Sequence, residues 1–251
     1  MSNKLDLSKE FEGRKVLVTG GTRGIGAAIA QRLLDAGGDV VVVGRARTDD
    51  IPASAKFVAG DVSTNEGVKA IAAQALAALG GLDILVNNAG GSKAFLGGSE
   101  TIPDEEWQRD LALNLLAAVR LTNATLPALR SSKAASIVNI SSTAATTPFP
   151  FDVHYGAAKA ALDYYSRTLA IELGSSGIRV NVVTPGPIST PNSDELRKQL
   201  PISGDEWNQY VPLGRIGAPE DIAEVVVLLA SERGKFLTGV NYRVDGGMTA
   251  R

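Results

Sequence analysis

The chain has 251 residues, of which 44% are hydrophobic and 21% are charged, and its formal net charge is −2. That length suits one α/β domain with a large core, and the charge gives no reason to expect nucleic acid or an anionic membrane as partner. The sequence has no cysteine and one histidine, which excludes disulfides, thiolate chemistry and a histidine-rich metal site. It has no run of the roughly twenty apolar residues that a membrane span needs and no signal-peptide core at its start, so we expect a cytoplasmic protein.

Short runs rich in β-branched residues alternate with longer helical stretches along the chain. The runs predicted as strands are Val16–Thr19, Val40–Val43, Lys56–Ala59, Ile84–Asn87, Ile137–Ser141, Val180–Thr184 and Val240–Val244. The segments predicted as helices are Gly24–Ala36, Asn65–Leu79, Pro103–Arg130, Val153–Gly174 and Pro219–Ser231. Several strands are apolar at nearly every position, as strands covered on both faces are. The pattern predicts an α/β fold: a loosely held lead-in over residues 1–10, then one domain over residues 11–251. That domain is a Rossmann-type doubly wound parallel sheet of about seven strands with helices on both faces.

The least regular region follows the sixth predicted strand. Prolines at 185, 187, 191, 201 and 212 surround a short helical stretch, Asp194–Gln199. Long loops in compact domains are usually functional or disordered, and a loop at the carboxyl end of a central strand borders the ligand crevice of such a sheet. We therefore predict a substrate lid around residues 187–213, with a plain surface excursion as the alternative.

A glycine-rich turn joins the first predicted strand to the first predicted helix, with the spacing Gly-x-x-x-Gly-x-Gly. Such a turn presents backbone N–H groups and a helix dipole to a pyrophosphate, and its glycines leave room for the ligand. The turn therefore predicts a dinucleotide-binding site. Its candidate residues are Gly20, Thr22, Arg23, Gly24, Ile25 and Gly26.

The end of the second predicted strand favours NADP(H) over NAD(H). An NAD site places an acidic residue there to hold the ribose 2′-hydroxyl, whereas an arginine accommodates a 2′-phosphate. Here the strand ends in Gly44-Arg45, with Arg47 beyond it and no acid at the tip, and Arg23 in the glycine turn is a second cation within reach. The alternative is that these arginines are solvated surface charges.

Tyr155 and Lys159 are four residues apart on a predicted helix, so they share one face. A nearby ammonium favours the phenolate and lowers the pKa of a tyrosine toward the range that is useful for proton transfer. The same spacing also arises by chance, with a solvated lysine beside a core-facing tyrosine. Other motifs of the chain decide between the two interpretations.

The motifs of this chain stand in an order that closely resembles the short-chain dehydrogenase/reductase family. The likeness spans about residues 13–247. Its motifs are the glycine turn, Asn87-Asn88-Ala89-Gly90, Ser142, Tyr155-x-x-x-Lys159, Pro185-Gly186 and Asp245-Gly246-Gly247. Because each follows the expected strand or lies on the expected helix, the signal is specific.

The resemblance implies a catalytic set of four residues. Tyr155 would exchange a proton with a carbonyl or alcohol oxygen, and Lys159 would lower the pKa of Tyr155 and hold the nicotinamide ribose. Ser142 would position the substrate oxygen, and Asn114 would hold a water in a proton relay to the lysine. For Asn114 alone, the alternative is a polar residue bonded to backbone inside a helix.

The resemblance also implies the remaining cofactor contacts. They are Asp61 and Val62 at the adenine, Asn88, Ala89 and Gly90 at the ribose, Tyr155 and Lys159 at the nicotinamide ribose, and Pro185, Gly186, Ile188 and Thr190 at the nicotinamide. One departure from many relatives is the connection from Arg45 to Asp61, which is too short for a full helix. We expect a loop or a single turn there.

Aromatic residues near Tyr155 and in the lid suggest a mainly apolar ketone, or its alcohol, as substrate. The candidate substrate contacts are Ser142, Phe149, His154, Tyr155 and Trp207. Adjacent helical residues point about 100° apart, so His154 has packing at the helix start or at an interface as its alternative role.

The sequence thus predicts an NADP(H)-dependent oxidoreductase that interconverts a ketone and a secondary alcohol. One alternative is a 3-oxoacyl-carrier-protein reductase, although Arg167 is the only cation between Lys159 and Arg179 to form a docking face. A second is a non-catalytic NADP-sensing or scaffold protein. The resemblance also implies a homotetramer that buries the two long helices between subunits. The stripe compatible with this consists of Ala157, Ala161, Tyr164, Tyr165 and Thr168, which could instead pack on the chain's own sheet.

Overall fold

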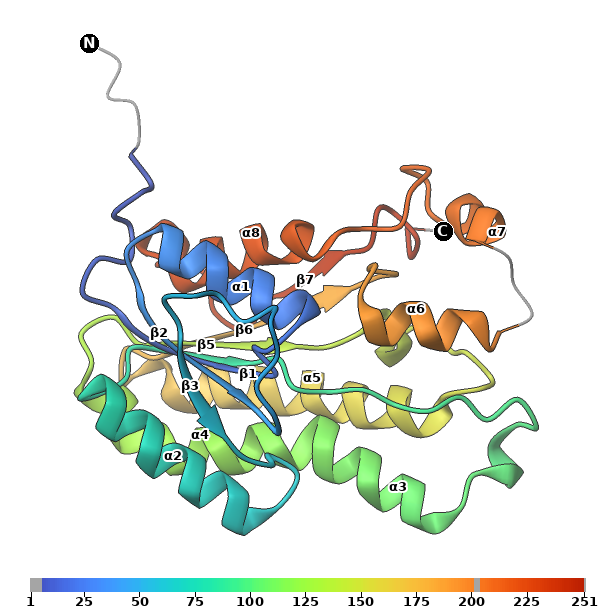
Figure 1. The fold of residues 1–251 in the computed structure, drawn as a ribbon, viewed down its shortest axis with the longest axis horizontal. Coiled ribbons are helices and arrows are strands. Elements are labelled where there is room, and N and C mark those ends of the chain that lie inside the picture. Colours follow the sequence, from blue (N-terminus) through green and yellow to red (C-terminus); the bar gives the residue numbers. More distant parts are fainter. Residues whose placement is uncertain (1–5, 201–203, 251) are drawn as a thin grey trace.

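A computed structural model describes residues 6–200 and 204–250, without the side chains of residues 204, 205 and 207. Seven parallel strands form one central sheet in the order β3-β2-β1-β4-β5-β6-β7 (Figure 1). They are β1 Lys15–Thr19, β2 Asp39–Gly44, β3 Lys56–Ala59, β4 Ile84–Asn87, β5 Ser136–Ile140, β6 Arg179–Pro185 and β7 Asn241–Val244. The predicted fold class is confirmed, and every strand ends within one residue of its predicted bounds.

Helices cover both faces of the sheet, with α1 and α8 on one face and α2, α4 and α5 on the other (Figure 1). The helices are α1 Gly24–Asp35, α2 Asn65–Leu79, α3 Asp104–Leu111, α4 Ala117–Ser131, α5 Val153–Gly174, α6 Pro191–Lys198, α7 Gly204–Tyr210 and α8 Pro219–Ala230. Because strand side chains alternate between the faces, Val16 and Val18 belong to the core under α1 and α8, and Leu17 belongs to the core under α2, α4 and α5. No helix within the described ranges is long and apolar enough to span a bilayer.

Three segments differ from the sequence prediction. The single helix expected over Pro103–Arg130 is divided into α3 and α4 by a π-helical turn, Ala112–Leu116. The stretch expected at Asp194–Gln199 is α6, which begins at Pro191, and α7 was not predicted. One expectation for the connections is confirmed, because the segment between β2 and β3 contains no helix, as its length indicated.

The order of the strands reverses between β1 and β4, because β2 lies on one side of β1 and β4 on the other. In open parallel sheets, ligands bind outside the carboxyl ends of the strands at such a reversal. The loops that follow β1, β4, β5 and β6 meet at this edge, and they carry most of the predicted site.

Candidate active site at the carboxyl edge of the sheet

The glycine turn after β1 forms a cradle for an anion. Gly20 and Gly24 have positive φ angles of 63° and 54°, which favour glycine. A Cβ on Gly26 would lie 2.2 Å from the carbonyl oxygen of Gly20, so the first turn of α1 needs a glycine there. Arg23, the residue before α1, makes no side-chain cap, and the first turn holds no acidic residue. The first N–H groups of α1 therefore have no side-chain acceptor, and the turn fits a pyrophosphate.

The predicted arginines lie on the surface beside this turn. Arg23, Arg45 and Arg47 are all exposed. Within residues 6–200 and 204–250, Arg23 and Arg45 form no ion pair, and the guanidinium of Arg47 lies 5.9 Å from the ring centroid of Phe57. No acidic residue occupies the carboxyl end of β2. Two cations without a paired acid are therefore available beside the anion cradle.

Asp61 and Val62 follow β3 near Arg45. Val62 is buried, whereas the Asp61 carboxylate accepts hydrogen bonds from Ser63 N at 2.8 Å and Ser63 Oγ at 2.7 Å. These hydrogen bonds, and secondarily the charge of Arg45, lower the pKa of Asp61. Thus Asp61 is a fixed carboxylate at the edge where the adenine contact is expected.

Hydrogen bonds tie the loop after β4 to the glycine turn. Thr19 Oγ1 accepts from the backbone N–H groups of Asn88 and Ala89, each at 3.0 Å. In return, Asn88 Nδ2 donates to the carbonyl oxygens of Thr19 at 2.9 Å and Gly20 at 3.2 Å. The structure therefore brings the predicted residues Asn88, Ala89 and Gly90 next to the turn.

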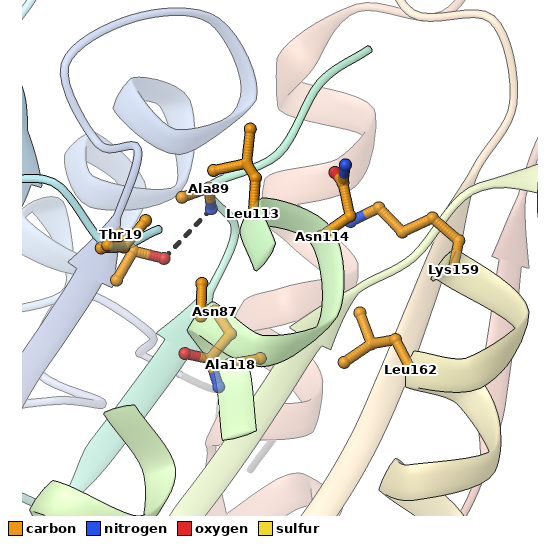
Figure 2. A pocket seen from close by; sticks show the side chains of 10 residues that line it. Thr19, Asn87, Ala89, Leu113, Asn114, Ala118, Lys159 and Leu162 are labelled. Atoms are coloured by element: carbon orange, nitrogen blue, oxygen red, sulfur yellow. Dashed lines mark hydrogen bonds between the residues drawn. The ribbon is translucent and has the colours of Figure 1, made fainter. Parts of the chain in front are cut away.

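Asn114 lies in the π-helical turn and holds the same loop. Its Nδ2 donates to Gly91 O at 3.0 Å and to Asp110 O at 3.1 Å, and its Oδ1 accepts from Gly91 N at 3.0 Å. A Cβ on Gly90 would lie 2.8 Å from Asn114 Oδ1 and 3.1 Å from Lys159 Nζ. Single π-helical turns inside α-helices often mark functional sites, and here the turn sets Asn114 beside Lys159 (Figure 2).

A small cavity of about 10 Å³ lies between these residues, lined among others by Thr19, Asn87, Asn114 and Lys159 (Figure 2). That volume is close to the minimum that holds one water molecule. Its polar lining supplies donors and an acceptor, so this position suits a relay water beside Lys159.

Ser142 and Tyr155 face each other across the start of α5. Ser142 caps the 3-10 turn Thr143–Ala145, where its Oγ accepts from Ala144 N at 3.2 Å. Gly156 lets α5 approach this turn, since a Cβ there would lie 2.7 Å from Ala144 O. The Ser142 side chain is close enough to Tyr155 to lower the pKa of the phenol. Both hydroxyls are thus placed together at the carboxyl end of β5.

Burial has a larger effect on the pKa of Tyr155 than the neighbouring lysine has. Burial raises the pKa of Tyr155 to about 12, against a smaller lowering by the Ser142 side chain. Burial also lowers the pKa of Lys159 to about 8. Lys159 Nζ donates to Ile140 O at 2.8 Å and lies 5.8 Å from the Tyr155 ring centroid. The expected lowering of the Tyr155 pKa is therefore wrong for the polypeptide by itself, because desolvation of the phenolate outweighs the attraction of a lysine at this distance.

The loop after β6 joins the lid region to the glycine turn. Gly186 packs closely on the residue that follows β7, since a Cβ there would lie 2.7 Å from Asp245 Cα. Ile188 is buried, and Thr190 caps α6 by accepting from Ser193 N at 3.2 Å. Thr190 Cγ2 lies 3.1 Å from the position of a Cβ on Gly24. Thr190, expected at the nicotinamide, thus borders the anion cradle.

The predicted substrate contacts are only partly brought together. Half-buried Phe149 stacks on Phe151 with ring centroids 5.6 Å apart, close to Ser142 in the chain. His154, by contrast, is 0% exposed and packs edge-on against Phe95 and Trp107. The prediction of a direct substrate contact by His154 is corrected on this ground, and packing at the helix start is its observed role. The side chain of Trp207 lies outside the described part of the structure.

Sequence reasoning missed one residue of this region, Asp110. Asp110 is fully buried, and its Oδ2 accepts a hydrogen bond from Ser92 Oγ at 2.6 Å. An aspartate four residues before Asn114 was the only available signal, and a helical aspartate is ordinarily solvated.

Comparisons with known proteins identify the family of the chain. A family profile described as enoyl-(acyl carrier protein) reductase matches residues 20–249. A 3-oxoacyl-[acyl-carrier-protein] reductase of Escherichia coli is 36% identical over 248 residues, covering 95% of this chain and 98% of that protein. The 3beta-hydroxysteroid dehydrogenase 1 of Eggerthella lenta is 35% identical over 251 residues, covering 96% of this chain and 95% of that protein.

A solved structure described as a short chain dehydrogenase/reductase family protein has 40% identity and a TM-score of 0.87, and the match covers 96% of this chain and 100% of that one. The names of these relatives refer to different substrates, so the likeness identifies a family and no single substrate. The chain belongs to the short-chain dehydrogenase/reductase family, whose oxidoreductases use nicotinamide cofactors to interconvert CH–OH and C=O groups.

Proposed function

We propose that this protein is an NADP(H)-dependent oxidoreductase that interconverts a mainly apolar ketone and its secondary alcohol. The observation that carries the proposal is the meeting of Ser142, Tyr155, Lys159 and Asn114 at the sheet edge that holds the anion cradle. When bound, the nicotinamide dinucleotide supplies or accepts the hydride. The chain's own residues supply binding, orientation and the path of the proton.

In this proposal, Tyr155 holds the proton that is delivered to the substrate oxygen. Its raised pKa keeps the phenol protonated at neutral pH, which suits a proton donor in ketone reduction. Ser142 lies next to Tyr155, so the two hydroxyls together position a carbonyl oxygen. Loss of the proton leaves a phenolate, and the Lys159 ammonium stabilises that charge. The cavity between Asn114 and Lys159 suits a water that returns the proton.

The choice of NADP(H) is supported by the charges beside the cradle. Arg23 and Arg45 lie exposed without an ion pair among the described residues, and the end of β2 has no acid for a ribose 2′-hydroxyl. A 2′-phosphate would gain charge-assisted hydrogen bonds there. The backbone N–H groups at the start of α1 would hold the pyrophosphate.

The lid is likewise a proposal. It is supported by the position of residues 187–200 and 204–213, which follow β6 at the site edge and contribute α6 and α7. Thr190 at its start approaches Gly24 of the glycine turn. Closure of this segment would exclude water from the carbonyl during reduction.

A 3-oxoacyl-carrier-protein reductase is the second candidate, favoured by the name of the Escherichia coli relative. A panel of ketones, β-keto esters and 3-oxoacyl thioesters, assayed by loss of NADPH absorbance with chiral analysis of products, separates the two. Faster turnover of carrier-linked thioesters than of free ketones would favour the second candidate.

The variant Tyr155→Phe tests the catalytic assignment. We expect kcat to fall by a factor of about 100 to 10,000, because a general acid is removed, while NADPH binding changes less than about threefold. Tyr164→Phe on the exposed face of the same helix is the matched control and should leave kcat unchanged. A Tyr155→Phe protein with full activity would overturn the proposal. NADPH binding by a wild-type chain that turns over no member of the panel would favour the sensor alternative.

A further inference from the structure

A buried aspartate and histidine lie directly behind the proposed catalytic residues. Asp110 stands in the last turn of α3 and His154 is the second residue of α5, and both side chains are 0% exposed. His154 Nε2 lies 3.4 Å from Asp110 Oδ2. Ionisable groups are rarely buried unless their polar atoms are engaged, so their partners indicate what the pair does.

The shared partner of the pair is Ser92, in the loop that follows β4. Ser92 Oγ donates to Asp110 Oδ2 at 2.6 Å and lies 3.2 Å from His154 Nε2. With the Ser92 hydroxyl donating to the Asp110 carboxylate, a His154 ring that carries its proton on Nε2 donates to the serine oxygen. Three elements, the loop, α3 and α5, are thus joined at one hydroxyl group.

The preceding residue of the loop, Gly91, is held from the π-helical turn that follows α3. Asn114 binds the backbone N–H and carbonyl of Gly91, each at 3.0 Å, and donates to the carbonyl of Asp110 at 3.1 Å. Gly91 and Ser92 are therefore fixed side by side, one by Asn114 and the other by Asp110 with His154.

This fixation matters because the loop has no spare room at Gly90. A Cβ on Gly90 would come within 2.8 Å of Asn114 Oδ1 and 3.1 Å of Lys159 Nζ. A shift of Ser92 that pulled Gly90 away would change the packing of Lys159 and the lining of the cavity beside it. The neighbour of His154 in α5 is Tyr155 itself. The proposed proton path runs from Tyr155 to the cavity beside Lys159, so both of its ends depend on this packing.

Charges around the pair are mutually compensated. Arg109 Nη2 lies 3.0 Å from Asp110 Oδ1, and Glu106 pairs with Arg109 at 2.6 Å and with Lys93 at 2.5 Å. Burial lowers the pKa of His154, which keeps the ring neutral at neutral pH. Asp152, at the start of α5, is a further acid near Asp110, and burial raises its pKa to about 6.

The Ser92, His154 and Asp110 side chains do not form a hydrolytic triad. In such a triad the serine and the aspartate bind opposite nitrogens of the histidine ring. Here both approach Nε2, while Nδ1 is buried without a partner. The histidine therefore cannot pass a proton from the serine toward the aspartate, and a holding role remains.

We propose that Asp110 and His154 are positioning residues which, through Ser92, fix the segment Gly90–Ser92 against Asn114 and Lys159. Both side chains are 0% exposed, which leaves neither of them on the surface that a ligand would meet. The effect on catalysis rests on the function proposed above, whereas the effect on the loop does not.

Three variants test the proposal. His154→Phe keeps an aromatic ring but removes the N–H donor, Ser92→Ala removes the shared hydroxyl, and His154→Gln retains an N–H donor at the position of Nε2. For the first two we expect a fall in kcat of about tenfold and faster amide hydrogen exchange at residues 90–92 by a similar factor, since a buried hydrogen bond is lost. His154→Gln should stay within about threefold of wild type in both measurements. Ser99→Ala, at an exposed serine of the same loop, is the control.

The outcomes separate this inference from the proposed function. Equal losses in His154→Phe and His154→Gln would show that only the ring volume matters and would overturn the positioning role, as would wild-type exchange in Ser92→Ala. If His154→Phe does not fold, Ser92→Ala and His154→Gln still decide the question. If the wild type reduces no ketone, the proposed function fails, yet faster exchange in Ser92→Ala with normal exchange in His154→Gln would still support the positioning of the loop.

Discussion

Tyr155 and Lys159 show how burial changes the chemistry of two neighbouring side chains. The Tyr155 pKa rises to about 12 and the Lys159 pKa falls to about 8, because desolvation disfavours the charged form of each. At neutral pH the tyrosine therefore keeps its proton, and the lysine is still mostly charged. This is the protonation state that a proton donor backed by a cation requires, and it is reached without a low pKa on the tyrosine.

The exposed arginines give a prediction about the cofactor. In Arg45→Asp, an acid would stand where an NAD site usually has one, and it would repel a 2′-phosphate. We expect the ratio of kcat/KM for NADPH to that for NADH to fall by about 100-fold, which corresponds to the loss of charge-assisted hydrogen bonds. Arg47→Asp is the comparison, and a smaller change is expected because Arg47 already stacks on Phe57. A wild-type enzyme that prefers NADH would contradict the assignment.

Some residues of the site could be placed from the sequence, and others could not. The spacing of Ser142, Tyr155 and Lys159 follows from short elements whose geometry is local, so their placement at one edge could be expected. The burial of His154 could not, because it depends on Phe95 and Trp107, which reach it from other elements. Asp110 escaped notice for the same reason, since its partners lie on a loop and on α5.

At the level of elements, the division of the predicted long helix is the most instructive difference. Four of the residues Ala112–Leu116 are alanine or leucine, which are good helix formers, and local propensity predicts an uninterrupted helix. The π-helical turn is associated with a contact distant in sequence, in which Asn114 binds both backbone groups of Gly91. The absence of a helix between β2 and β3, by contrast, followed from chain length alone.

The end of α8 depends on one arginine of β6. Arg179 donates through its guanidinium to Leu229 O, Leu237 O, Ala230 O and Ser231 O, which include the last carbonyls of α8. Arg179→Met would keep the aliphatic stem and remove the guanidinium donor from all four carbonyls, while Ser136 Oγ at 3.4 Å and Asn181 Nδ2 at 2.8 Å would still donate to Leu229 O and Leu237 O. We expect a loss of about 2–3 kcal/mol of unfolding free energy and a fall in Tm of about 4–10 °C, measured by circular dichroism. Arg130→Met, on the exposed end of α4, should shift Tm by less than about 2 °C. Equal effects of the two substitutions would refute the capping role.

At the level of the whole molecule, two cores fill the space between the sheet and its helices, and the outer face of α5 remains uncovered in the single chain. Tyr164 is 69% exposed and Ile171 is 85% exposed. Of the predicted stripe, Ala157, Tyr164 and Thr168 are exposed, while Ala161 and Tyr165 are half-buried. Packing of the stripe on the chain's own sheet is therefore wrong for its exposed members. Large apolar side chains gathered on one helix are typical of a subunit interface.

The homotetramer remains a prediction, and the α5 face makes it testable. In the double variant Tyr164→Lys, Ile171→Lys, each subunit would lose two apolar side chains from the proposed interface, at a cost of about 1.5–3 kcal/mol each when fully buried. The introduced charges would also repel across a two-fold axis. We expect the wild type to sediment as a tetramer and the double variant as smaller species. Leu96→Lys, at an exposed apolar residue outside α5, should stay tetrameric. A monomeric wild type, or a double variant that still assembles fully, would show that this face is not the interface.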